Sequence, residues 1–305
     1  MGRKWLRSRT LAVTKKNIMF SFKIDWAPNE VFLNLGPITI YWYSVMFIIA
    51  FSLGYYIVQK IYKNDNKPIS LVEPLFIYVV FGTLIGARLG EVFFYNWDYF
   101  QNNLIEIILP IKNDANSSML FGLIDGYKFS GYRGLASHGA TIGIITAMFI
   151  YKYKFKYDSV LWIFDRIVIP ISIGGMFVRI GNFFNSEIVG NYTNSNFGVV
   201  FKNNGEIFPR HPAQLYEAFG YLILFIILWN IYWKTDLKKS KGFIFGLFLT
   251  CLFSIRILVE NVKESQGGLE ESLGILSTGQ WLSIPFVIIG ITLMIFSKKG
   301  TNNIS

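Results

Sequence analysis

The stretch VRIGNFFNSEIVG, from Val178 to Gly190, holds an arginine, a glutamate, a serine and two asparagines within an otherwise apolar sequence. It continues the run LWIFDRIVIPISIGGMF at residues 161–177, and the two together exceed the about 20 residues that a helix needs to cross a bilayer. Charged side chains are costly at membrane depth, and where they occur they usually mark a functional site. We therefore expect a membrane helix that carries a polar site.

The composition of the 305 residues is that of a membrane protein. Hydrophobic residues make up 52% and charged residues 16% of the chain, and the mean hydropathy is +0.40, which is too apolar for an ordinary soluble domain. Cys251 is the only cysteine, and His138 and His211 are the only histidines. A disulfide framework or a multi-histidine metal site is therefore not expected. The net charge of +10 comes in short clusters between apolar runs, which is typical of membrane topology rather than of nucleic-acid binding.

Apolar segments of spanning length predict an all-α membrane protein, a bundle of about seven transmembrane helices with short external loops. The segments lie near residues 40–59, 71–94, 134–150, 159–184, 212–233, 243–262 and 278–296. Lysines cluster after the first, third, fifth and seventh segments, and the positive-inside rule makes these connections cytoplasmic. The N-terminus and the loops at 95–133 and 185–210 are then outside, and the C-terminus is in the cytoplasm.

Residues 1–18 do not fit this topology, because they carry six basic residues at an end that is predicted to be outside. They also lack the apolar core of a signal peptide. Our hypothesis is that this basic N-terminal extension reflects a mis-assigned start and that translation begins at Met19. Without it the net charge falls from +10 to +4. Residues 19–305 are expected to form a single polytopic membrane domain.

The predicted spans contain several ionisable residues. They are Glu73, Arg88, Glu91, Asp165, Arg166, Arg179, Glu187, Arg256 and Glu260. Each would cost about 2.5–3.5 kcal/mol at the centre of a helix exposed to lipid. They are therefore expected to face one another, water or a ligand.

Helical spacing places some of these residues on one face. Arg179 and Asn182 are three apart, and Arg256 and Glu260 are four apart, so each pair shares a helix face. Arg256 and Glu260 are then either a structural ion pair or part of a ligand site. Asp165 and Arg166 are adjacent and diverge around the helix, which predicts separate partners.

The two histidines allow both structural and functional interpretations. His138 lies among small residues in the sequence SHGA. It is either a hydrogen-bonded structural residue or a base, and its small neighbours leave room for a lipid headgroup. The sequence HPAQLYE, from His211, predicts a helix whose first residue is Pro212. Gln214 and Glu217 are three apart near the start of that helix, and both are candidates for a polar site.

Several motifs together resemble one family, the bacterial prolipoprotein diacylglyceryl transferases. The family signature G-R-x-G-N-F-x-N-x-E, with a glycine three residues later, is similar to residues 178–187 followed by Gly190, although Val178 replaces the leading glycine. Other matches follow in the family's order: Trp42-Tyr43, GARLGEVFFYN at 86–96, SHGA at 137–140, HPAQLYE at 211–217, RILVE at 256–260 and STGQWLS at 277–283. Ala140 and Leu252 stand where the family usually has a glycine and a tyrosine.

The resemblance implies an enzyme of the bacterial cytoplasmic (inner) membrane. The enzyme would transfer the diacylglyceryl group of phosphatidylglycerol to the lipobox cysteine thiol of a prolipoprotein, which forms a thioether and releases glycerol phosphate. No metal, organic cofactor or nucleic-acid partner is implied. The competing function is an anion or lipid transporter with buried arginines, and a seven-span receptor is a third.

The reaction needs a group that favours the thiolate and a cation that binds the departing phosphate, for which an arginine fork is well suited. The expected catalytic residues are His138, Arg179 and Arg256, with Arg179 and Arg256 as the phosphate clamp. His138 is either the base or a residue that positions the substrate. The expected substrate-binding residues are Tyr43, Arg179, Asn182 and Gly190. The expected supporting residues are Glu187, Gln214 and Glu260.

Overall fold

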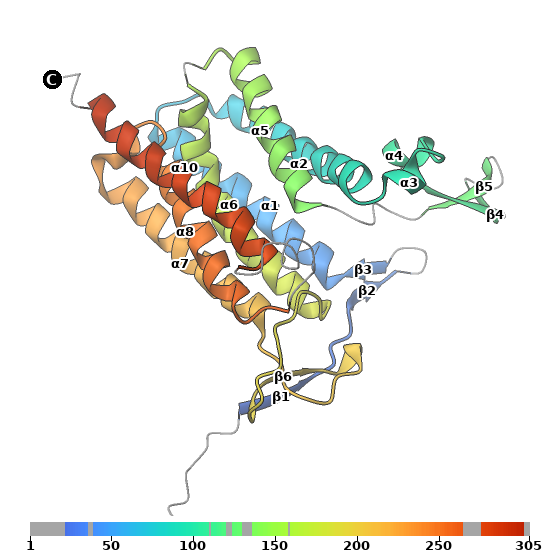
Figure 1. Cartoon of the computed structure of the whole chain (residues 1–305). Helices are drawn as coiled ribbons and strands as arrows, with labels where there is room; N and C mark the ends of the chain where they lie inside the picture. The colour runs from blue at the N-terminus through green and yellow to red at the C-terminus, as the bar shows by residue number, and fades with distance from the viewer. Residues whose placement is uncertain are drawn as a thin grey trace, which may run out of the picture.

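The computed structural model describes residues 22–35, 39–109, 111–119, 124–129, 136–157, 159–264 and 276–301. The predicted N-terminal extension at residues 1–18 and the proposed start at Met19 lie outside the described residues. Long helices occupy the seven predicted places (Figure 1). They are α1 (Trp42–Asn64), α2 (Val72–Phe94), α5 (Ser137–Lys154), α6 (Val160–Phe184), α7 (Ala213–Lys234), α8 (Phe243–Glu260) and α10 (Thr278–Thr301).

Six of these helices are long and apolar enough to cross a membrane, among the residues that the structure describes. The exception is α5, the third predicted span, which begins with polar residues and ends with Lys152 and Lys154. One predicted boundary is wrong by a single position. α7 begins at Ala213, and Pro212 is the N-cap residue with non-helical backbone angles. The multi-pass all-α architecture predicted from the sequence is confirmed.

Helix α6 lies at the centre of the bundle. Buried residues make up 56% of its apolar window, against 11–33% for the other candidate spans. It packs mainly against α1 and α7, and α8 packs mainly against α10. The stretch that begins at Val178 starts in the last part of this central helix, so Arg179 and Asn182 face neighbouring helices rather than lipid alone.

Helices α2 and α5 form a pair that diverges from the rest of the bundle (Figure 1). Their backbones approach closely through glycines, as is usual between membrane helices. A Cβ atom added to Gly86 would lie 2.7 Å from the Cα atom of Gly143, and one added to Gly90 would lie 2.6 Å from the Cα atom of Gly139. The α2–α5 pair packs much less extensively against α1 and α6. This leaves room for a cavity between the pair and these two helices.

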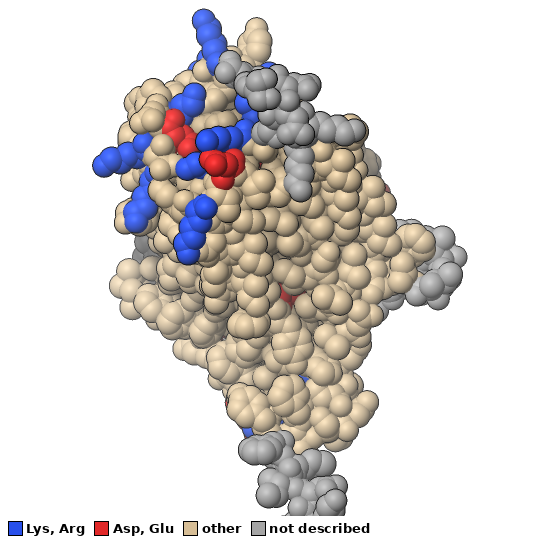
Figure 2. Space-filling view, turned by 90° about the vertical axis from the view of Figure 1, so that its left-hand side faces the viewer, with Lys and Arg blue, Asp and Glu red and all other residues tan. Residues whose placement is uncertain are grey.

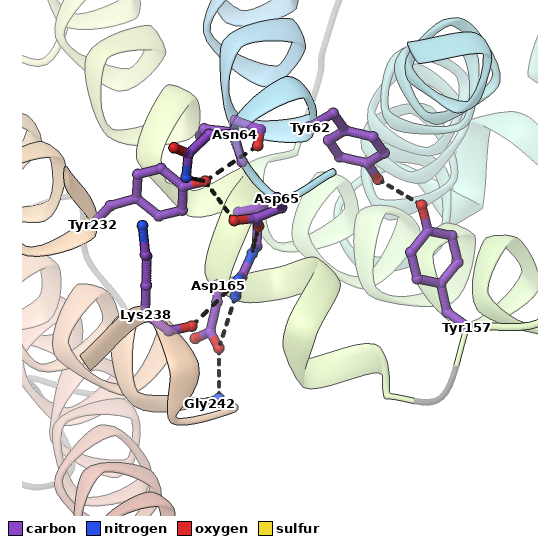
Figure 3. Close-up of polar contacts among 10 residues, drawn as sticks. Tyr62, Asn64, Asp65, Tyr157, Asp165, Tyr232, Lys238 and Gly242 are labelled. Atoms are coloured by element: carbon purple, nitrogen blue, oxygen red, sulfur yellow. Dashed lines mark hydrogen bonds and ion pairs between the residues drawn. The ribbon is translucent and has the colours of Figure 1, made fainter. Parts of the chain in front are cut away.

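A buried polar cluster ties α1, α6, α7 and α8 together at one end of the bundle (Figure 3). Arg166 donates from Nε to Asp65 Oδ2 at 2.8 Å, and the hydroxyl of Tyr232 donates to Asp65 Oδ1 at 2.8 Å. Asp165 instead accepts hydrogen bonds from the backbone N–H groups of Gly242 at 2.7 Å and Phe245 at 2.8 Å, at the start of α8. Asp165 and Arg166 therefore hydrogen-bond to different partners, as predicted, and they also form an ion pair with each other, with Arg166 Nη1 3.8 Å from Asp165 Oδ2.

Basic side chains gather at this same end of the molecule, above a broad surface with few charges (Figure 2). The opposite end carries small two-stranded sheets: β1 (Phe22–Trp26) pairs in parallel with β6 (Phe197–Phe201), and β2 (Val31–Asn34) pairs with β3 (Thr39–Tyr41). A third sheet, β4 (Ile111–Met119) with β5 (Ile124–Phe129), follows the short helices α3 (Trp97–Phe100) and α4 (Ile105–Ile108). The indole of Trp26 donates to the carbonyl of Phe183 at 3.0 Å, which attaches β1 to the end of α6.

Candidate functional site

An amphiphilic cavity of about 540 Å³ lies between α1, α2 and α6 and extends to α7 and α8. Side chains such as Phe47, Phe51 and Phe76 form its apolar walls. The polar lining comes from the end of α6 and the residues beside it. It includes Tyr43, Arg179, Asn182, Tyr221, Arg256 and Lys263. Four of the predicted site residues, from three different helices, are therefore brought together in one cavity.

Arg179 is held by two fixed partners. Its Nη1 donates to Asn182 Oδ1 at 3.0 Å, one turn further along α6. Its Nε forms an ion pair with Glu217 of α7, whose carboxylate is almost fully buried. An arginine fork that is oriented in this way keeps further N–H donors for a ligand in the cavity.

The end of α6 explains how Glu187 reaches Asn182. After Phe184 the chain leaves the helix through Ser186, whose φ of +54° is left-handed. The N–H of Ser186 donates to the carbonyl of Phe183, and the N–H of Glu187 donates to the carbonyl of Asn182 at 3.1 Å. This is the hydrogen-bond pattern of a Schellman motif. It turns Glu187 back along the helix, where its Oε1 accepts from Asn182 Nδ2 at 2.6 Å.

Gln214 supports the same turn from α7. Its Nε2 donates to the backbone carbonyl of Glu187 at 2.6 Å, and its side chain is fully buried. Glu187, Asn182 and Arg179 thus form a connected series that Gln214 holds in place. The predicted supporting residues Glu187 and Gln214 lie next to the cavity rather than in its lining.

Arg256 of α8 faces the same cavity. The structure does not show the possible ion pair between Arg256 and Glu260. Among the described ion pairs, the partner of Glu260 is Lys263, with Nζ and Oε2 3.7 Å apart. Gly279 leaves space for this carboxylate, because a Cβ atom at that position would lie 2.5 Å from Glu260 Cδ. Arg256 is therefore available to a ligand, while Glu260 supports the site.

Gly190 is a packing position at the crossing of three segments. A Cβ atom there would lie 2.6 Å from the carbonyl oxygens of His211 and Val262. Its N–H donates to the carbonyl of His211 at 2.9 Å, and its carbonyl accepts from Arg210 Nη1 at 3.1 Å. Gly190 does not belong to the cavity lining, so in this structure its close approach is to backbone.

His138 lies at the start of α5, and its side chain is exposed. It does not line the cavity, although Ala140, two residues later, does. Successive residues of a helix are separated by about 100° around its axis, so the two side chains face different directions. The structure therefore separates His138 from Arg179 and Arg256.

The structure adds Lys263 and Tyr221 to the site, and it shows Glu217 as the ion-pair partner of Arg179. Lys263 is 9% exposed and lies three residues after the end of α8. Burial lowers the pKa of its ammonium group below the ordinary value; Arg179 and Arg256 act in the same direction, and Glu217 and Glu260 oppose them. The sequence does contain a signal for this residue. Positions 256, 260 and 263 repeat the spacing of one helix face.

Comparisons with known proteins show the family of this chain. The family model for prolipoprotein diacylglyceryl transferase matches residues 30–296. The chain belongs to the prolipoprotein diacylglyceryl transferase family. The phosphatidylglycerol–prolipoprotein diacylglyceryl transferase of Bacteroides fragilis is 43% identical over 285 residues, which are 93% of this chain and 98% of the relative. The transferases of the same name from Chloroherpeton thalassium and Tolumonas auensis are 40% and 38% identical, over 90% of this chain and 95% and 97% of those relatives.

The region that matches the transferase family covers all of the candidate site. It begins before Tyr43 and ends beyond Gly279. The basic residues at the N-terminus lie outside the matched region. The cavity and the residues that support it therefore belong to the part of the chain that this family shares.

Proposed function

We propose that this membrane enzyme transfers the diacylglyceryl group of phosphatidylglycerol to the lipobox cysteine of a prolipoprotein. The observation that carries the proposal is the amphiphilic cavity, which joins apolar walls to the guanidinium groups of Arg179 and Arg256. A diacyl phospholipid has this same combination of acyl chains and an anionic phosphate. The family assignment favours the transferase over an anion or lipid transporter.

The cysteine thiol supplies the nucleophile. Its sulfur attacks the glycerol carbon that carries the phosphate, a carbon–sulfur bond forms, and the carbon–oxygen bond breaks. The electron pair leaves with the phosphate oxygen as glycerol phosphate, and the thiol proton passes to a base or to solvent. A free thiol with a pKa of about 8.5 is mostly protonated at neutral pH, so cations beside the sulfur favour reaction by favouring the thiolate.

Arg179 and Arg256 are proposed to bind the phosphate from two helices. The leaving group gains negative charge as the bond breaks, so preorganised guanidinium donors stabilise the transition state more than the ground state. Asn182 and Tyr43 position the headgroup, and Gly190 permits close packing beside it. Glu187, Gln214 and Glu260 hold these groups in place, as the described contacts indicate. Cys251 of α8 is expected to be dispensable, since the substrate supplies the reactive thiol.

His138 retains two possible roles, the base or a residue that positions the substrate. Either role requires the α2–α5 pair to bring the imidazole closer to the cavity than it lies in this structure. A His138→Asn variant with an unchanged rate of transfer would rule out the base. A rate that falls and no longer depends on pH between about 5 and 8, where histidine titrates, would support it.

The proposed orientation places the N-terminus and the sheets outside the cytoplasmic membrane and the C-terminus inside. Arg179 and Asn182 lie at the outer end of α6 in this orientation, at the depth of the outer leaflet's headgroups. The apolar walls then run toward the middle of the bilayer. Labelling of single cysteines introduced at Lys202 and Lys239 in intact spheroplasts tests this, with Lys202 accessible and Lys239 protected.

The activity is tested with the purified protein in vesicles that contain phosphatidylglycerol and a lipobox peptide. Mass spectrometry should detect the peptide with an added diacylglyceryl group, together with released glycerol phosphate. Arg179→Gln and Arg256→Gln should each lower the rate by at least about 10²-fold, as loss of a preorganised charge donor does. Lys202→Gln, on the external surface, is the matched control. Full activity of either arginine variant would contradict the phosphate clamp.

A further inference from the structure

Lys263 is fixed beside the cavity by its backbone. It forms an isolated antiparallel bridge with Gly190, and its carbonyl accepts from Asn191 Nδ2 at 3.2 Å. The next residue is held as well, because the N–H of Glu264 donates to the carbonyl of Val189 at 3.2 Å. The backbone at Lys263 is thus held by hydrogen bonds. Its side chain contributes to the cavity lining together with Arg179 and Arg256.

The Lys263 side chain is buried without full compensation. The side-chain atoms alone are 7% exposed, and the ion pair with Glu260 Oε2 is long, at 3.7 Å. An ammonium group has three donors, and burial of a charge without hydrogen bonds is costly. Among the described residues no hydrogen bond from Nζ accompanies this ion pair. The lowered pKa of the group expresses the same lack of compensation. An anion in the cavity would supply hydrogen-bond acceptors for the ammonium group.

The charges around the cavity are arranged by sign. Arg179, Arg256 and Lys263 contribute to the lining, whereas the carboxylates of Glu187, Glu217 and Glu260 are not part of it in the described structure. Glu217 instead contacts Arg179, and Glu260 contacts Lys263. The cavity lining thus presents positive groups from α6, from α8 and from the segment after α8, and these two acids are not in the lining.

We propose that Lys263 is a third cationic contact to the phosphate of the lipid donor, together with Arg179 and Arg256. This inference rests on the proposed function. A phosphodiester carries one negative charge, and the released glycerol phosphate carries up to two, so a third cation stabilises the charge that develops during bond cleavage. Lys263 thereby acts on the leaving group, while the thiol and its proton are handled elsewhere.

Three variants test the role of Lys263. Lys263→Met removes the charge and keeps the length of the side chain, and Lys263→Arg keeps the charge. Lys202→Met is the matched control, because Lys202 is an exposed lysine on the external face. In the vesicle assay, Lys263→Met should lower kcat/KM for phosphatidylglycerol by about 10–10³-fold, with KM for the lipobox peptide unchanged. Lys263→Arg should recover most of this loss, and Lys202→Met should match the wild type.

A binding measurement separates failure of this inference from failure of the proposed function. Native mass spectrometry of the detergent-solubilised protein would compare retention of phosphatidylglycerol with retention of diacylglycerol, which lacks the phosphate. If the wild type transfers nothing, but Lys263→Met still loses phosphatidylglycerol selectively, the phosphate contact stands and the transferase proposal falls. Wild-type kcat/KM and lipid retention in Lys263→Met would overturn the contact. Equal losses in Lys263→Met and Lys263→Arg, with lowered melting temperatures, would also overturn it and indicate a packing role.

Discussion

Asn182 and Glu187 are joined by a hydrogen bond of 2.6 Å that closes the turn at the end of α6. The same asparagine accepts from Arg179 Nη1 at 3.0 Å. Asn182 therefore links the turn after α6 to the arginine that faces the cavity. Asn182 thus belongs both to the turn that ends α6 and to the lining of the cavity.

Replacement of Glu187 by alanine should lower transfer activity. The buried amide of Asn182 would lose its acceptor, which costs about 1–3 kcal/mol and allows the amide to rotate away from Arg179. We expect kcat/KM to fall by roughly 10–10²-fold, measured with the lipobox peptide. Glu187→Gln keeps an acceptor oxygen and should lose less. Asn230→Ala, which removes an exposed amide of α7, is the control. Equal activity of Glu187→Ala and the wild type would refute the link.

Replacement of Gly86 by leucine should separate α2 from α5. A Cβ atom at Gly86 would already lie 2.7 Å from the Cα atom of Gly143, so the helices must move apart. Overpacking of this kind costs about 1–3 kcal/mol, and we expect a lower melting temperature in detergent. Ile85→Leu, at the exposed neighbouring position, should leave it unchanged. A melting temperature for Gly86→Leu that equals the wild-type value would show that the two helices do not pack as described.

The buried pair of Arg166 and Asp65 should show strong coupling. Their side chains are 5% and 11% exposed, and removal of one partner leaves a buried charge, which costs about 3–5 kcal/mol. Arg166→Met should therefore destabilise the protein strongly, as should Asp65→Asn to a smaller extent. The double variant should be more stable than the sum of the single changes implies. Additive effects in a double-mutant cycle of unfolding free energies would contradict the pair.

The loop at residues 185–210 should lose stability in acid through Glu206. Its carboxylate accepts hydrogen bonds from Arg210 Nε at 2.7 Å and from the Tyr192 hydroxyl at 2.7 Å. Burial opposes ionisation of Glu206, but these two donors outweigh it, so its pKa lies below the ordinary value. Between the folded pKa of Glu206 and about pH 4.3, the unfolded chain binds more protons than the folded protein. The stabilisation is therefore present above about pH 4.3 and is lost as the pH falls through the folded pKa.

The measurement is the difference in melting temperature between the wild type and Glu206→Gln as a function of pH. The wild type should be more stable at pH 7, and the two curves should converge in acid. Asp25→Asn, which removes an exposed carboxylate of β1 3.7 Å from Lys202, is the control. A constant difference between wild type and Glu206→Gln at all pH values would show that the Glu206 charge contributes nothing.

The sequence predicted the helices well because their length and apolarity are properties of single segments. The bilayer requires about 20 apolar residues for a helical span, and the observed helices begin and end near the predicted boundaries. Spacing within α6 also predicted that Arg179 and Asn182 share a face, which their hydrogen bond confirms. The ordered motifs indicated the family, which the comparisons confirm.

Partners on different helices depended on packing that no single segment encodes. Glu217 reaches Arg179 from α7, and Lys263 takes the place beside Glu260 that spacing also offered to Arg256. His138 does not belong to the cavity lining, because its side chain faces a different direction from that of Ala140 on the same helix. The sequence by itself determined which segments form the long apolar helices and which charges they carry. Only the tertiary structure decided which charges meet, because helix rotation and separation arise from contacts between distant segments.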